Sequence, residues 1–177
     1  IVASDIKELR RMAGWPSCVA TIGNFDGVHL GHQELLRRTV DRAHSKELPS
    51  VVVTFDPHPA AIFTEYPPKL LCSREQCLEI LKGLGVDAVL LMPFTRELAE
   101  QSAESFCRRV LQDELGVQEL FVGYDFRLGS DQAAGAGLVV NHDGGVGVLG
   151  SDFGTECAAF VHCNDIVDII VISLGAH

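Results

Sequence analysis

Two histidines, His29 and His32, stand three residues apart at the start of a segment with helical spacing. Residues three apart on a helix share a face, and the first turn of a helix has backbone N–H groups without partners inside the helix. Imidazoles beside such donors, at the positive end of the helix dipole, suit the charge that builds on a phosphate under attack. Gly31 leaves room between the two rings. The pair therefore predicts an anion site suited to transfer from a nucleoside triphosphate.

A glycine-containing loop precedes the histidines. It follows the apolar run 18–22, which reads as a strand, and it holds Gly23 and Gly27. Glycine permits backbone angles and close approaches that other residues resist, so a phosphate can come within reach of backbone amides here. The order strand, glycine-containing loop and helix favours a nucleotide-binding turn.

Two other interpretations of the histidine pair stay open at this point. Histidines at a helix start are often caps or ordinary surface residues. A zinc site is the third interpretation, but its other candidate ligands lie scattered along the chain and belong to no recognised zinc spacing. Those candidates are His58, His142 and His162.

Strand-like apolar runs alternate with segments of helical period. Strands are predicted over 18–22, 51–55, 88–92 and 120–122, and helices begin near Leu30, after Ser73 and after Ser102. This alternation predicts an α/β fold, a Rossmann-like doubly wound parallel sheet with crossover helices. The run 51–55 is nearly all β-branched, so we expect it to lie inside the sheet with both faces covered. Beyond residue 130 glycines dominate, and 159–162 and 166–173 are expected to form a terminal hairpin.

Composition limits the partners. The 177 residues predict a single domain, and 24 acidic against 14 basic residues give a formal charge of −10. That charge repels a polyphosphate backbone, so no nucleic-acid partner is expected, although aligned amides can still hold a small anion. The longest nearly apolar run, 166–174, has about half the length that a membrane-spanning helix requires. No membrane anchor is expected, and no oligomeric state is predicted.

The cysteines are expected to be reduced and buried. Six are present, none forms a C-x-x-C pair, and most sit within apolar or helical patterns. A disulfide framework belongs to shorter secreted chains, and the N-terminus shows no charged region followed by a long apolar run. We therefore expect a cytoplasmic protein.

The run Gly23-Asn-Phe-Asp-Gly-Val-His-Leu-Gly-His32 resembles the signature of bacterial FAD synthetase, the adenylyltransferase module of bifunctional riboflavin kinase/FMN adenylyltransferase. The His-x-Gly-His element alone indicates only the wider nucleotidyltransferase superfamily, and other blocks narrow the resemblance. Those blocks agree in order with the family and are Val53-Thr-Phe-Asp-Pro-His-Pro59, Ser102-Ala-Glu-Ser-Phe106 and Val122-Gly-Tyr-Asp-Phe-Arg-Leu-Gly129.

The resemblance implies FAD synthesis by transfer of AMP from ATP to FMN, with release of pyrophosphate. Mg²⁺ would accompany ATP, and no metal-ligating residue is assigned. His29 and His32 would be catalytic, with ATP-binding residues at Gly23, Asn24, Phe25, Asp26, Gly27, Gly31, Asp125 and Arg127. FMN-binding residues would be Phe55, Pro57, His58 and Pro59.

The residues alone leave two of these assignments open. The prolines of the Phe55 to Pro59 run also fit an ordinary strand terminator, because they fix backbone φ and remove N–H donors. Asp125, which follows a predicted strand, equally fits a turn former or a helix cap.

The end of the chain departs from the family pattern. In the family a Ser-Ser-Thr-x-Ile-Arg motif follows a late strand, whereas Ile172-Ser173 leads here into Leu174-Gly-Ala-His177. We therefore expect residues 131–177 to be divergent or truncated and the riboflavin kinase domain to be absent from this chain. Two alternative functions follow, a catalytically impaired nucleotide or flavin binder and a related His-x-Gly-His transferase with another phosphate substrate.

Overall fold

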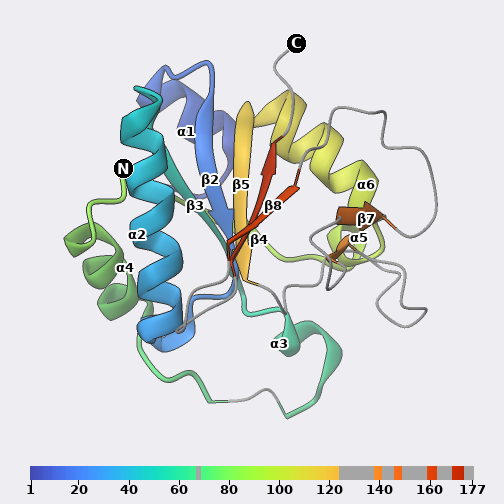
Figure 1. Ribbon diagram of the computed structural model, residues 1–177. Coiled ribbons are helices and arrows are strands. Elements are labelled where there is room, and N and C mark those ends of the chain that lie inside the picture. Colours follow the sequence, from blue (N-terminus) through green and yellow to red (C-terminus); the bar gives the residue numbers. More distant parts are fainter. Residues whose placement is uncertain (67–68, 124–137, 141–145, 149–158, 163–168, 174–177) are drawn as a thin grey trace.

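A seven-stranded sheet forms the centre of the molecule. The computed structural model describes residues 1–66, 69–123, 138–140, 146–148, 159–162 and 169–173. Within them the strands follow the order β1-β4-β3-β2-β5-β9-β8. In Figure 1 the sheet runs between α2 and α4 on one side and α6 on the other.

The first five strands of that order are parallel. They are β1 (Val2–Ala3), β4 (Ala88–Pro93), β3 (Ser50–Asp56), β2 (Cys18–Ile22) and β5 (Val117–Gly123). Beside β5, β9 (Ile169–Ser173) and β8 (Ala159–His162) run antiparallel. A separate antiparallel pair joins β6 (Leu138–Val140) to β7 (Val146–Val148).

Helices connect the strands and cover both faces of the sheet. One face packs against α1 (Ile6–Ala13) and the segment formed by α6 (Ala103–Ser105) and its π-helical continuation η2 (Phe106–Glu114). The other face packs against α2 (Leu30–Ser45) and α4 (Arg74–Gly83). The described residues also contain three short helices, η1 (Asp26–Val28), α3 (Ala60–Phe63) and α5 (Arg96–Ala99).

Alternation along β2 explains the two layers. Cys18, Ala20 and Ile22 belong to the core under α1 and η2, whereas Val19 belongs to the core under α2 and α4. Successive side chains of a strand point to opposite faces, so a fully apolar strand is buried on both sides. This burial confirms the predicted doubly wound α/β fold, the four predicted strands and the interior place of β3.

Three features differ from the sequence-based expectation. The expected terminal hairpin is present, as β8 and β9, but it joins the main sheet beside β5 in antiparallel pairing, so the sheet is not wholly parallel. Neither β1 nor α1 was predicted from the sequence. A two-residue strand has too little pattern, whereas α1 does have local signals, in its Asp5 N-cap and its Gly14 C-cap. The cysteines are not all reduced: Cys72 and Cys77 form a disulfide. Their spacing gave no signal, because Cys72 precedes α4 and its position depends on a contact with Asp26, which lies 46 residues away in the sequence.

The remaining expectations concern the other cysteines, membrane-spanning helices and the number of domains. Cys18 and Cys107 are buried and form no disulfide, as predicted, while Cys157 and Cys163 lie outside the described residues. None of the described helices combines the length and the apolar character that a membrane crossing requires. The single domain over residues 1–177 stays a prediction.

Candidate active site at the start of α2

Residues 23–28, called the signature loop below, leave β2 through an unusual backbone path. Phe25 and Val28 have φ angles of 47° and 36°, in the left-handed region that side chains other than glycine rarely adopt. Both side chains are buried, at 2% and 1% exposure, so packing holds them in this conformation. Backbone outliers held by their surroundings cluster at functional sites.

His29 and His32 lie together where the signature loop becomes α2. The His29 ring caps the helix, because its Nδ1 accepts the N–H of His32 at 3.3 Å. The two rings stack with centroids 3.7 Å apart and planes 20° apart, and the buried Phe25 ring lies 5.1 Å from that of His32. His29 therefore fits both the cap interpretation and a site residue.

Two further backbone N–H groups in the first turn of α2 have no hydrogen-bond acceptor among the described residues. Within the described part of the chain, the amides of Leu30 and Gly31 donate to no protein acceptor. Unpartnered first-turn amides at the positive end of a helix bind anions readily. The structure thus places two imidazoles and two amide donors at one helix start. The start of α2 lies at the bottom of that helix in Figure 1.

The signature loop is bonded to β3, the neighbouring strand. The Gly23 N–H donates to the Val53 carbonyl at 3.1 Å, and the Thr54 hydroxyl donates to the Asn24 carbonyl at 3.2 Å. Strands β2, β3 and β5 run parallel, so their carboxyl ends reach the same edge of the sheet. Ligands of open α/β sheets bind at that edge.

The Asp26 side chain contacts the segment just before α4. Its carboxylate accepts the N–H of Leu71 at 2.8 Å and that of Cys72 at 3.3 Å. The carboxylate therefore holds the segment before α4 against the signature loop. In this structure its role is to shape the loop, and Gly27, with φ of 73°, supplies the tight turn beside it.

The residues implied for FMN leave β3 at the same edge. Phe55 is half-buried, and its ring meets Phe94 edge to face, with centroids 5.2 Å apart. The peptide between Asp56 and Pro57 is cis. His58 Nδ1 accepts the N–H of Ala60 at 3.2 Å, and Pro59 precedes α3. The run from Phe55 to Pro59 therefore ends strand β3 and also lies at the sheet edge where a ligand is expected, so both interpretations of this run fit the structure.

The edge also contains residues that sequence reasoning did not identify. Phe94 contacts both Phe55 and Phe63, and the 69% exposed Phe63 extends the aromatic row outward. Arg74, at the start of α4, forms an ion pair with Asp56. No local spacing signals these contacts, because their partners are far apart in the sequence.

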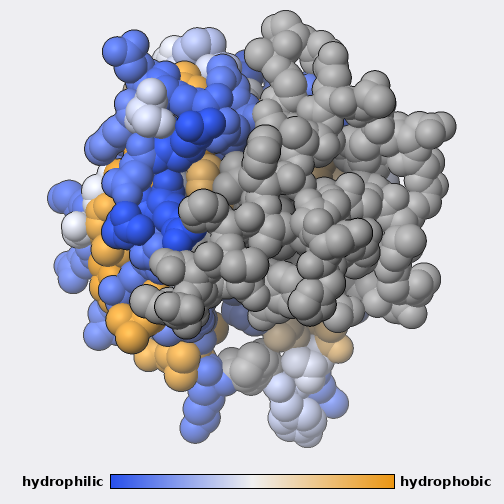
Figure 2. Space-filling view, viewed as in Figure 1, coloured by the Kyte–Doolittle hydropathy of each residue, from blue (hydrophilic) through white to orange (hydrophobic). Residues whose placement is uncertain are grey.

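Asp125 and Arg127 lie outside the described residues, so their proposed place beside ATP is not tested. The three arginines of α2, Arg37, Arg38 and Arg42, each have an acidic partner. Hydrogen bonds from Arg37 and Arg38 lower the pKa of Glu34 to about 2. Farther along, Arg42 binds Glu119 at 2.7 Å. Figure 2 shows this polar face, with apolar side chains gathered below it.

Comparison with known proteins identifies the family. A family model described as FAD synthetase matches residues 12–151. The chain belongs to the FAD synthetase family. Among its relatives, the bifunctional riboflavin kinase/FMN adenylyltransferase of Pseudomonas fluorescens is 48% identical over 117 residues, covering 65% of this chain and 37% of the relative. The protein of the same name from Escherichia coli strain K12 is 41% identical over 114 residues, covering 64% of this chain and 36% of the relative.

The FAD synthetase fold is also seen among solved structures. A macrolide-efflux protein from Streptococcus pneumoniae matches with a TM-score of 0.63 and 29% identity, over 74% of this chain and 44% of that chain. The present chain spans little more than a third of the length of the curated relatives above, with 37% and 36% covered. The segment that the family model matches, residues 12–151, includes the signature loop and α2.

One potential metal-binding group occurs among the described residues of this FAD synthetase-family chain. It consists of Asp26, Cys72 and Cys77, whose ligand atoms lie within 4.8 Å of one another, but the two sulfurs are joined in a disulfide and offer no thiolate to a metal. Magnesium prefers oxygen ligands and dehydrates reluctantly, so two sulfurs and one carboxylate do not suit it. A magnesium ion that accompanies ATP would be held chiefly by the phosphates and by water.

Proposed function

We propose that this chain joins ATP and FMN to give FAD and pyrophosphate. The arrangement of His29, His32 and the open amides of Leu30 and Gly31 supports the proposal, because all four groups favour negative charge at one point. Family membership supports it independently. The named relatives are bifunctional, and the adenylyl-transfer activity is proposed here for the part that the present chain matches.

The reaction is a displacement at phosphorus. An oxygen of the FMN phosphate attacks the α-phosphorus of ATP, and the bond to the departing pyrophosphate breaks, with no covalent enzyme intermediate. Such chemistry depends on positioning and on stabilising charge. His29 and His32 would stabilise the charge at the α-phosphate, and Gly31, which has no Cβ, would allow close approach. Gly23, Asn24, Phe25, Asp26 and Gly27 would shape the ATP side, with Asp125 and Arg127 joining them.

FMN would lie on the β3 side of the edge. Phe55, Pro57, His58 and Pro59 would border it, and the Phe55, Phe94 and Phe63 rings offer apolar faces and edges to a flat heterocycle. A loop stiffened by prolines loses little conformational entropy when a ligand binds. Magnesium would enter with ATP and screen the triphosphate, so no protein-bound metal is required. Both substrates are small and water-soluble, and we keep the cytoplasm as the expected compartment.

The direct test is to incubate the chain with FMN, ATP and magnesium and to separate flavins by chromatography. FAD should appear in proportion to enzyme, and a His32→Ala variant should form far less. CTP in place of ATP, and other phosphates in place of FMN, distinguish a related transferase. Absence of FAD with calorimetric binding of ATP would replace the proposal with a nucleotide binder.

A further inference from the structure

The disulfide between Cys72 and Cys77 lies directly against the signature loop. The two cysteines are half-buried, with Cα atoms 6.3 Å apart. The Sγ of Cys72 also accepts the N–H of Gly27 at 3.4 Å. One sulfur atom is therefore bonded to α4 and hydrogen-bonded to the loop that precedes the two histidines.

The two ends of this connection differ in how firmly they are held. Cys77 lies in the first turn of α4 and packs against the core that includes the buried Leu81. Cys72 lies just before that helix, in a segment flanked by Leu71, which is 78% exposed. The disulfide thus ties a surface segment to a helix that is anchored in the core.

The surface segment in turn holds the signature loop. Asp26 accepts the amides of Leu71 and Cys72, and the hypothetical Cβ of Gly27 would lie only 3.0 Å from the Leu71 side chain, so loop and segment are in close contact. Figure 1 shows the chain passing from α3 below the sheet to α4 beside the start of α2. A change at Cys72 is therefore felt by the loop next to His29.

We propose that the Cys72–Cys77 bond is a reversible redox modification site that sets how firmly the signature loop is held. The consequence for ATP affinity rests on the proposed function, whereas the effect on the loop does not. Reduction by a dithiol transfers two electrons and two protons to the pair. A thiolate of the reductant attacks one sulfur, the S–S bond breaks through a mixed disulfide, and the reductant leaves as its own disulfide.

The other described cysteines do not compete for this chemistry. Cys18 and Cys107 are buried, and burial raises the pKa of the Cys18 thiol to about 12. The thiolate is the reactive form, so such a thiol is inert at neutral pH. Cys72 and Cys77 are partly exposed, and disulfides in reducing compartments are usually transient or redox-sensing.

Hydrogen exchange of the full chain tests the inference with and without a dithiol, in the presence of a chelator. Labelling with a maleimide should show that reduction frees the two thiols of this bond. In the reduced chain, amide exchange at 26–28 and 71–72 should accelerate at least about fivefold, because the disulfide that fastens Cys72 to α4 is lost. Amides of β3 should be unaffected.

A Cys77→Ser variant is the matched control, since it lacks the bond in both conditions. Its exchange should resemble that of the reduced parent chain and should not respond to dithiol. Equal exchange in the oxidised and reduced parent overturns the inference, and so does a thiol count that dithiol treatment leaves unchanged.

Calorimetry with ATP separates the inference from the proposed function. We expect reduction to weaken ATP binding by at least about threefold, as the loop must be ordered when ATP binds. Equal affinities in both states overturn the link to ATP. If neither state binds ATP, the proposed function fails, while the exchange measurements still decide whether the bond controls the loop.

Discussion

His29 combines a structural and a chemical role at one residue. Its ring accepts the N–H of His32 and so caps α2, while its face stacks on the second imidazole. A cap stabilises the helix whether or not a substrate is bound. A group that faces a reacting phosphate contributes only when charge develops there. The two roles are separable, because asparagine is also a good cap but has no imidazole.

Replacing His29 by asparagine should therefore keep the helix start and lose the chemistry. We expect His29→Asn to lower the rate of FAD formation by about 10²–10³-fold, the usual effect of removing one stabilising donor. The same variant should retain the melting temperature of the parent. His29→Ala should lose the rate and also about 1 kcal/mol of stability, because its side chain cannot cap. Equal rates for the parent and His29→Asn would leave His29 as a cap only.

Thr54 fixes the signature loop from the neighbouring strand. Its hydroxyl is nearly buried and donates to the Asn24 carbonyl at 3.2 Å. Thr54→Val keeps the shape but removes the donor, and should cost about 0.5–1.5 kcal/mol in urea unfolding. The Michaelis constant for ATP should rise, while Thr54→Ser restores both values. A valine variant with unchanged stability and unchanged ATP dependence would contradict this role.

At the scale of elements, the strand, loop and helix containing the signature could be predicted because their signals are local. Apolar alternation, glycines and helical period all fall within residues 18–45. The capping box of α4 was also readable, and the structure contains both of its hydrogen bonds, between Ser73 and Gln76. Signals of this kind depend only on residues that are close together in the sequence.

The contacts that assemble the site could not be predicted in the same way. Asp26 meets Leu71 across 45 residues, and Thr54 meets Asn24 across 30. Strand β1 pairs with β4 from the middle of the chain, placing Val2 beside Val89. Such pairings depend on the closure of long loops, which no short-range pattern records. The disulfide was missed for the same reason, since the position of Cys72 depends on the long-range contact of its N–H with Asp26.

Gly116 connects the end of η2 to β5 at a point of close backbone approach. It has φ of 73°, and a Cβ there would lie 2.3 Å from the Pro16 carbonyl oxygen. Gly116→Ala should therefore destabilise the chain by about 2–4 kcal/mol, through left-handed strain and overpacking. Urea unfolding measures the change. The control is Gly83→Ala in α4, where nothing lies within 4 Å, and which should gain about 0.5 kcal/mol from helix propensity.

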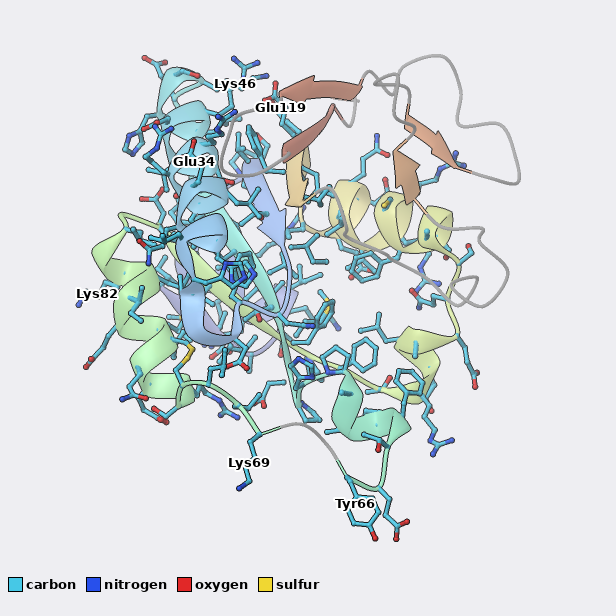
Figure 3. All side chains as sticks on the ribbon, turned by 60° about the horizontal axis from the view of Figure 1, so that its bottom comes forward. Glu34, Lys46, Tyr66, Lys69, Lys82 and Glu119 are labelled. Carbon is cyan, nitrogen blue, oxygen red and sulfur yellow. A yellow bond between two sulfur atoms is a disulfide. The ribbon has the colours of Figure 1, made fainter. Side chains whose placement is uncertain are left out.

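At the scale of the whole molecule, one buried carboxylate joins the outer layer to the sheet. Glu119 of β5 binds Arg42 of α2 at 2.7 Å and Lys46, the C-cap residue of α2, at 2.8 Å, and its side chain is only 7% exposed. Figure 3 shows Lys46 and Glu119 side by side at the far end of α2 from the histidines. Hydrogen bonds from Arg42 chiefly lower the pKa of Glu119 below its ordinary value of 4.5. Both ends of α2 are thus fixed, one by the signature loop and one by these ion pairs.

This cluster should make the stability of the chain sensitive to acid. Because the folded pKa of Glu119 is lowered, its contribution is complete above the ordinary value of 4.5 and is lost as the pH falls below it towards the folded pKa. Glu119→Gln should lower the free energy of unfolding by about 1–2 kcal/mol at pH 7, a limited loss because the half-exposed Arg42 regains water. The same variant should also show a smaller fall of the unfolding free energy as the pH is lowered into the acid range. Urea unfolding from pH 7 to pH 3 measures both effects, with Glu79→Gln on the exposed face of α4 as control. A Glu119→Gln chain with the acid slope of the parent would show that the ion pairs at the end of α2 do not set the acid stability of the molecule.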